Sequence, residues 1–208
     1  MSNTKENILV TALRLFAQDG YEAVSVSKIA GELGMTKGAL YKHYKNKRDI
    51  FNKIFEHICQ LDVERSQKAG VPEKEFDGTV EPFRNTSILS VKAYMVFQFH
   101  YWTEDEIACN FRKMLTLEQY RNSEMTDLYQ KVLGSGLVQF IEDMFREMME
   151  QGTLHKGNPK QMAVEFYAPF YLLLSISDTV HGKEEKGRIK NLYTMHLNCF
   201  FEKYAGGM

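Results

Sequence analysis

Hydroxyl, ammonium and phenol side chains are concentrated in a short stretch near the N-terminus, from Ser25 to Lys47. Groups of these types donate hydrogen bonds to phosphate oxygens and to the edges of bases, whereas none of them is paired here with an obvious catalytic partner. The stretch therefore favours binding of a polyanion. The residues best suited to such contacts are Ser27, Lys28, Thr36, Lys37, Gly38, Tyr41, Lys42, His43 and Lys47.

Positive charge is concentrated in the same N-terminal part of the chain. Residues 1–55 contain nine Lys or Arg and five Asp or Glu, a net charge of +4, and because the whole chain carries -1, the remaining residues carry -5. A basic segment in a near-neutral protein is typical of phosphate binding. A solvated lysine-rich helix face without any ligand would have the same charge, so charge alone leaves both interpretations open.

The elements that position these side chains are predicted to be helices. Apolar residues recur at helical spacing almost throughout, which predicts an all-α fold. Ser25 and Thr36 are suitable N-caps for two short helices, and Gly34 lies between them at a sharp turn. This is the layout of a helix-turn-helix. Asn46 is a suitable N-cap for a fourth, long helix that reaches about Ala69.

Beyond the fourth helix the sequence predicts a helical body. The Gly-, Pro- and acid-rich run from Gly70 to Pro82 predicts a connector, and helices are expected at about 84–101, 104–116, 123–151, 159–181 and 185–204. The total is about nine helices. We expect a DNA-binding domain over 1–46 and a ligand-binding and dimerisation domain over 47–208.

The run SVSKIAGELGMTKGALYKHYKNKRDIF, from Ser25 to Phe51, resembles the signature segment of the tetracycline-repressor (TetR) family. The resemblance covers about the first 55 residues. It rests on Phe16, Gly20, Ile29, Ala30, Gly34, Gly38, Leu40, Tyr41, Tyr44 and Lys47. It implies a three-helix head with Thr36 to Tyr44 in the major groove of double-stranded operator DNA, and a body that dimerises through its last two helices. The implied function is a homodimeric repressor that a small-molecule effector releases from DNA.

A second group of residues favours a ligand pocket in the body. The segment AYMVFQFHYWTEDE gathers aromatic side chains with a few polar ones, which is how apolar small molecules are often held. A bulky core explains the segment equally well. The expected lining residues are Ile58, Leu61, Tyr94, Phe97, Gln98, Tyr101, Trp102, Tyr120, Tyr129, Phe140 and Tyr167. The far half of the fourth helix, with Ile58, Leu61 and Arg65, is expected to face the aromatic segment around Tyr94 to Trp102.

Two apolar stripes predict where the body dimerises. Leu172, Leu173 and Ile176 form one stripe, and Ile189, Leu192, Tyr193, His196 and Phe200 form the other. Burial against a second copy of the chain would explain why both are apolar.

Other classes of protein find little support. There is no HExxH, no CxxC pair and no glycine-rich phosphate loop, so we expect no enzyme activity, no metal and no cofactor. The apolar run from Ala163 to Ile176 is too short to span a membrane, and we expect a cytoplasmic protein without membrane contact. Two alternatives stay open: a helical small-molecule-binding or scaffold protein that does not read DNA, and a regulator of the same fold without an effector.

Overall fold

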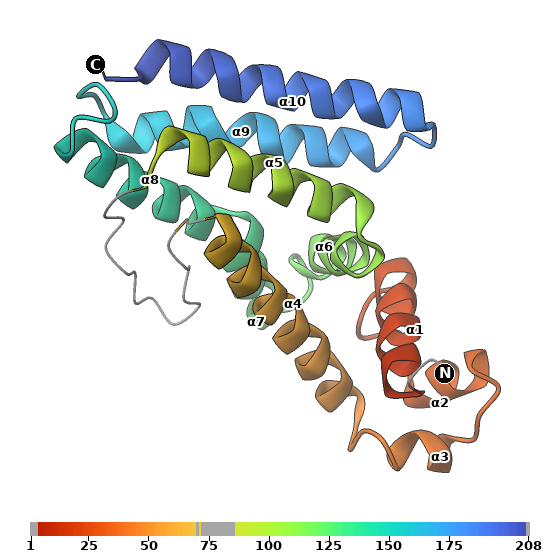
Figure 1. The fold of residues 1–208 in the computed structure, drawn as a ribbon. Coiled ribbons are helices and arrows are strands. Elements are labelled where there is room, and N and C mark those ends of the chain that lie inside the picture. The colour runs from red at the N-terminus through yellow and green to blue at the C-terminus, as the bar shows by residue number, and fades with distance from the viewer. Residues whose placement is uncertain (1–3, 70, 72–85, 207–208) are drawn as a thin grey trace. The chain divides into compact units, whose positions relative to one another are not determined.

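A computed structural model of the chain describes residues 4–69, 71 and 86–206, and these are almost entirely helical (Figure 1). The expected all-α fold is confirmed, with a single isolated bridge between Leu154 and Ala205. The helices of the described residues are α1 (Thr4–Asp19), α2 (Val26–Glu32), α3 (Lys37–Tyr41), α4 (Lys47–Ala69), α5 (Ile88–Glu104), α6 (Glu106–Glu118), α7 (Ser123–Leu133), α8 (Ser135–Glu150), α9 (Pro159–Ser177) and α10 (Lys183–Tyr204).

The chain divides into two compact units. The first comprises Met1–Asp62 and Asp105–Tyr129, and the second comprises Val63–Glu104 and Gln130–Met208. Helices α4 and α7 therefore contribute residues to both units. These units are defined by packing, so the expected boundary of a DNA-binding domain after residue 46 stays a prediction.

The first unit is built around α1. This helix packs against α6 and α2, and α2 packs against α3. The side chains of Ile8, Phe16, Ile29, Leu40 and Phe111 are completely buried between these helices. Each large apolar side chain removed from water stabilises the fold by roughly 1.5–3 kcal/mol, so these few contacts hold the short helices α2 and α3 in place.

The second unit is a bundle in which α5, α8, α9 and α10 lie side by side (Figure 1). Its core is aromatic. The Phe166 ring lies 4.8 Å from the Phe200 ring and 5.2 Å from the Phe145 ring, and the Phe99 ring stacks on Tyr193 at 4.8 Å. Such ring pairs add about 0.5–1.5 kcal/mol each beyond the area that they bury.

The long helix expected over 123–151 is instead two helices, α7 and α8. Gly134, at φ -114° and ψ -130°, is outside the helical region and serves as the N-cap of α8. Its N–H still donates to the carbonyl of Gln130 at 3.2 Å, which closes the last turn of α7. The helical periodicity continues on both sides of this glycine, which is why the apolar pattern alone did not predict the break. The connector expected from Gly70 to Pro82 lies, except for Val71, outside the described residues.

Candidate DNA-binding interface

The helix-turn-helix predicted from the sequence is formed by α2 and α3. The Ser25 hydroxyl accepts a hydrogen bond from the Lys28 N–H at 3.1 Å, and the Thr36 hydroxyl accepts one from the Ala39 N–H at 3.1 Å. Each cap satisfies one amide at the start of a helix, which stabilises that helix by about 1 kcal/mol. Gly34, at φ +64°, takes the left-handed conformation that turns the chain between the two helices.

Most residues expected to contact DNA are exposed on these two helices and the turn before α3. The exposed ones are Ser27, Lys28, Thr36, Lys37, Gly38, Tyr41 and Lys42. His43 is half-buried. The Lys37 ammonium lies 5.7 Å from the centre of the Tyr41 ring, and the Lys28 ammonium pairs with Asp19 at 2.8 Å. The structure thus gathers the expected residues on α2, α3 and their flanks, with donors available at the start of α3.

Exposed and buried side chains lie next to each other in α3 and just after it. Tyr41 is 44% exposed, whereas its neighbour Leu40 is completely buried. Tyr44 is buried, and its hydroxyl donates to the Lys5 carbonyl at 3.1 Å. Burial raises the pKa of the Tyr44 phenol above its ordinary value, so the hydroxyl keeps its proton and remains a donor. Tyr44 therefore joins the end of the motif to the start of α1.

Lys47 has a different environment from the other lysines. Its ammonium donates to the Tyr21 carbonyl at 2.8 Å and to the Glu22 carbonyl at 3.3 Å, and it lies 4.3 Å from the centre of the Tyr21 ring. The side chain is only 22% exposed. In this arrangement Lys47 holds the first turn of α4 against the link between α1 and α2. The phosphate contact expected of Lys47 stays a prediction.

A buried carboxylate on α6 supports the same link, and no local feature of the sequence predicted it. The Glu118 carboxylate accepts a hydrogen bond from the Tyr21 N–H at 2.9 Å and one from Arg121 at 3.2 Å. A Cβ atom at Gly20 would lie 2.5 Å from the Glu118 carboxylate and 2.6 Å from the Arg121 guanidinium. Only glycine allows this approach, and the φ of +90° at Gly20 also favours glycine.

A second unpredicted tie joins α4 to the start of α7. Arg48 makes two hydrogen bonds to the Glu124 carboxylate, one of them at 2.8 Å. The hydrogen bond from Arg48 lowers the pKa of Glu124 below its ordinary value, and the same bond raises the pKa of Arg48. Both side chains are largely exposed, so the pair orients the helices more than it stabilises them.

The second unit contains the aromatic segment for which a ligand pocket was expected. Gln98 donates to the Tyr94 hydroxyl at 2.6 Å and accepts from Arg65 at 3.4 Å. The Arg65 guanidinium lies 3.2 Å from the centre of the Tyr101 ring, and the Trp102 ring is 5.4 Å from that of Tyr101. Arg65 faces the aromatic segment, as predicted, and it adds a buried cation to that segment.

The other expected lining residues are placed less uniformly. Tyr120 is 87% exposed and Phe97 is 53% exposed, so the described chain does not enclose either side chain. In the first unit Ile58 and Tyr129 are buried and Leu61 is half-buried; in the second, Phe140 and Tyr167 are buried. The Tyr167 hydroxyl donates to the Leu133 carbonyl at 2.8 Å, a contact that supports packing.

Among the described residues, helices α9 and α10 expose a set of large apolar side chains. These are Val164, Tyr171, Leu172, Ile176, Leu192 and Met195. The predicted stripes are divided between two sides of these helices: Leu173, Ile189, Tyr193 and Phe200 are buried within the unit, whereas Leu172, Ile176 and Leu192 are exposed. Exposed apolar side chains in such number are typical of a protein interface.

The described residues contain no cluster of three His, Cys, Asp or Glu side chains arranged to hold a metal ion. Among them, no helix is long and apolar enough to cross a membrane.

Comparison with known proteins gives a family match for the N-terminal helices. Residues 8–54 match the family model described as bacterial regulatory proteins, tetR family. The uncharacterized HTH-type transcriptional regulator YerO of Bacillus subtilis (strain 168) is 28% identical over 167 residues, covering 74% of this chain and 55% of that protein. The HTH-type transcriptional regulator AcrR of Shigella flexneri is 42% identical over 69 residues, covering 31% of this chain and 32% of that protein. The matches thus span about half of the first relative and a third of the second.

Solved structures resemble the chain over nearly its whole length. The SmeT–triclosan complex gives a TM-score of 0.69 at 20% identity and covers 97% of this chain and 91% of that chain. SmeT, described as the repressor of a multidrug efflux pump of Stenotrophomonas maltophilia, gives 0.63 at 21% identity and covers 98% and 91%. At this identity the likeness shows the fold. Together with the family match, it confirms the resemblance predicted from the signature segment.

Proposed function

Because this chain carries the helix-turn-helix head of the TetR family of bacterial regulatory proteins, we propose that it is a DNA-binding transcriptional regulator. It acts as a homodimeric repressor that a small molecule releases from operator DNA. The observation that carries the proposal is the exposed donor face of α2 and α3. Thr36, Lys37 and Tyr41 point outward there, while Leu40 and Tyr44 fix the helix from beneath.

The start of α3 has the properties that reading a major groove requires. Its side chains include a hydroxyl, an ammonium and a phenol, which together contact phosphates and base edges. Gly38 has no side chain, so the helix backbone approaches the DNA closely at that position. The neighbouring lysines, Lys28 and Lys42, supply the sequence-independent attraction to phosphate.

The second unit supplies the contacts with a second copy of the chain and with the effector. The exposed apolar face of α9 and α10 fits the same face of a second chain, since a two-fold axis brings identical patches together. Two recognition helices then contact half-sites about one helical turn apart, or a multiple of it. The effector contacts the segment around Tyr94, Gln98, Tyr101 and Trp102.

The sharpest test of DNA reading is the Gly38→Ala variant. A Cβ at Gly38 meets no atom closer than 4.0 Å, so alanine fits the free protein and favours the helix. In the complex the added methyl group lies between the backbone and the base edges. We expect operator affinity to fall by at least about tenfold, which corresponds to about 1.4 kcal/mol. The measurement is fluorescence anisotropy with DNA from upstream of the protein's own gene.

The matched control is Gly31→Ala on α2. A Cβ at Gly31 has nothing within 4 Å, so the two substitutions have the same effect on helix propensity. The control is expected to bind the operator as the wild type does. If both variants bind equally well, α3 is not the reading helix. If neither the wild type nor the control binds any DNA, the protein is a helical binding or scaffold protein.

A further inference from the structure

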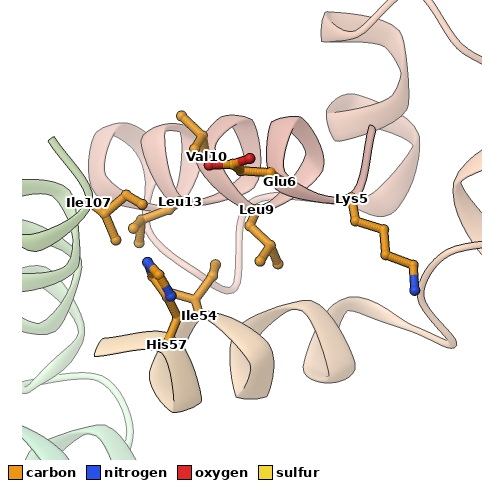
Figure 2. Close-up of a pocket in the computed structure, with 8 residues that line it drawn as sticks. All are labelled: Lys5, Glu6, Leu9, Val10, Leu13, Ile54, His57 and Ile107. Carbon is orange, nitrogen blue, oxygen red and sulfur yellow. The ribbon is translucent and has the colours of Figure 1, made fainter. Parts of the chain in front are cut away.

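The first unit contains a cavity that DNA reading does not use. It has a volume of about 250 Å³ and lies between α1, α4 and α6. Figure 2 shows its walls. Leu9, Val10 and Leu13 come from α1, Ile54 and His57 from α4, and Ile107 from α6, and Lys5 and Glu6 lie toward the start of α1. A dry apolar cavity of about 150 Å³ is large enough to hold benzene, so this one has room for two fused rings.

The polar groups around the cavity limit the chemistry of an occupant. Lys5 and Glu6 carry opposite formal charges that offset each other, and His57 adds ring nitrogens that form hydrogen bonds. A carboxylate ligand would gain from Lys5 but would be repelled by Glu6. A hydroxyl group, in contrast, forms a hydrogen bond with any one of these three side chains without bringing a charge into an apolar site.

We propose that this cavity binds a small uncharged aromatic compound of one or two rings that carries a hydroxyl group. The site is separate from the aromatic segment of α5, which belongs to the other unit. Binding itself does not depend on the proposed function. The effect of binding on DNA reading does depend on it. Lys5 lines the cavity, and its carbonyl accepts the hydrogen bond from Tyr44. A ligand that moves the start of α1 therefore also moves the end of the DNA-reading motif.

The test uses 2-naphthol as the probe and the full chain as the protein. Calorimetric titration is expected to give a Kd on the order of 0.1–1 mM, as suits about eleven heavy atoms. In methyl NMR spectra the largest shifts are expected at Leu9, Val10, Leu13, Ile54 and Ile107, with the indole N–H signal of Trp102 unchanged. The anionic analogue 2-naphthoate is expected to bind at least about tenfold more weakly because it faces Glu6.

Two variants distinguish the effect of filling the cavity from the effect of adding a tryptophan elsewhere on the surface. Leu9→Trp places an indole in the cavity and is expected to abolish binding of 2-naphthol. Leu117→Trp is the same change at an exposed position of α6, outside the lining, and is expected to leave binding unchanged. Circular dichroism checks that both variants are folded. The methyl shifts of the wild type give a second result that holds even if Leu9→Trp unfolds.

The outcomes distinguish the site from the regulator. Shifts at Trp102 in place of the cavity methyl groups, or no saturable binding, would overturn the site. Equal binding of 2-naphthoate would overturn the ligand class. If 2-naphthol binds in the cavity and weakens operator binding of the wild type but not of Leu9→Trp, the site acts on the motif. If 2-naphthol binds in the cavity but operator affinity does not change, the site stands and its effect on the motif is overturned. If neither the wild type nor any variant binds the operator, the proposed function is overturned and the site stands.

Discussion

The two units present two exposed faces of opposite chemistry. The face of α2 and α3 in the first unit consists of hydroxyl, ammonium and phenol groups over a buried Leu40. The face of α9 and α10 in the second unit consists of large apolar side chains such as Leu172 and Leu192, which are 58% and 54% exposed. Water solvates the first face well and the second poorly.

This difference indicates two kinds of partner. A polar, basic face is stable alone and binds a polyanion by releasing counterions, so its contacts are sensitive to salt. An apolar face gains free energy from any burial, and a second copy of the chain supplies the matching surface without further design. The comparison therefore predicts salt-dependent binding at one face and a largely salt-independent association at the other.

The largest effect is expected where a charge enters the apolar face. Leu192→Glu buries an unpaired carboxylate at the proposed dimer interface, which costs several kcal/mol and raises the dimer Kd by at least about a hundredfold. Sedimentation at micromolar concentration measures the change. The control is Leu89→Glu on α5, where the leucine is 77% exposed. A dimeric Leu192→Glu protein would place the interface elsewhere.

The two faces also differ in how well the sequence predicted them. The motif of α2 and α3 depends on local signals, namely the caps Ser25 and Thr36 and the turn at Gly34, so its two helices and the turn between them were predicted correctly. The apolar stripes of α9 and α10 were predicted, but their periodicity does not tell which side of a helix packs inside its own unit. Tyr193 and Leu192 are adjacent in the sequence, yet one is buried and the other exposed.

Contacts between distant residues were not predicted. Glu118 bonds the Tyr21 amide across 97 positions of sequence, and nothing near either residue signals the other. The break at Gly134 was missed because helical periodicity continues across it. Arg65 was expected to face the aromatic segment because α4 is one continuous amphipathic helix, whose register carries over many turns.

The second-largest effect is expected at Glu118, which supports the link between α1 and α2. Glu118→Ala leaves the Tyr21 amide without its acceptor and removes buried packing, and we expect the free energy of unfolding to fall by about 2–3 kcal/mol. Denaturant unfolding measures it. Glu106→Ala, an exposed glutamate on the same helix, is expected to cost less than about 1 kcal/mol. If both variants lose the same free energy of unfolding, Glu118 does not support the motif.

A smaller effect is expected in the salt dependence of DNA binding, where Lys37 and Lys47 should differ. Lys37→Ala is expected to reduce the slope of log K against log salt by about 0.9, because we propose that the exposed Lys37 contacts a phosphate. Lys47→Ala is expected to change that slope less than half as much and to lower stability by about 1 kcal/mol, since its ammonium is bound to the Tyr21 and Glu22 carbonyls. Equal slope changes would mean that Lys47 leaves those carbonyls when DNA binds.

The smallest effect belongs to the ion pair of Arg48 and Glu124, which lies on neither face. The hydrogen bond from Arg48 lowers the pKa of Glu124 from its ordinary value of 4.5, so the folded protein holds this proton less tightly than the unfolded chain does. The stabilisation is present above the unfolded pKa and is lost as the pH falls through the lower, folded pKa. Because both side chains are exposed, its size is below about 1 kcal/mol.

Unfolding of the wild type and of Glu124→Gln, measured from pH 7 to pH 3, tests this pair. The difference in unfolding free energy is expected to be largest at pH 7, to shrink as Glu124 takes up its proton in acid, and to shrink also at pH 7 in about 1 M salt, where the Debye length is only about 3 Å. A difference that persists unchanged at pH 3 and in high salt would show that Glu124 acts through packing at the start of α7 and not through the charge of Arg48.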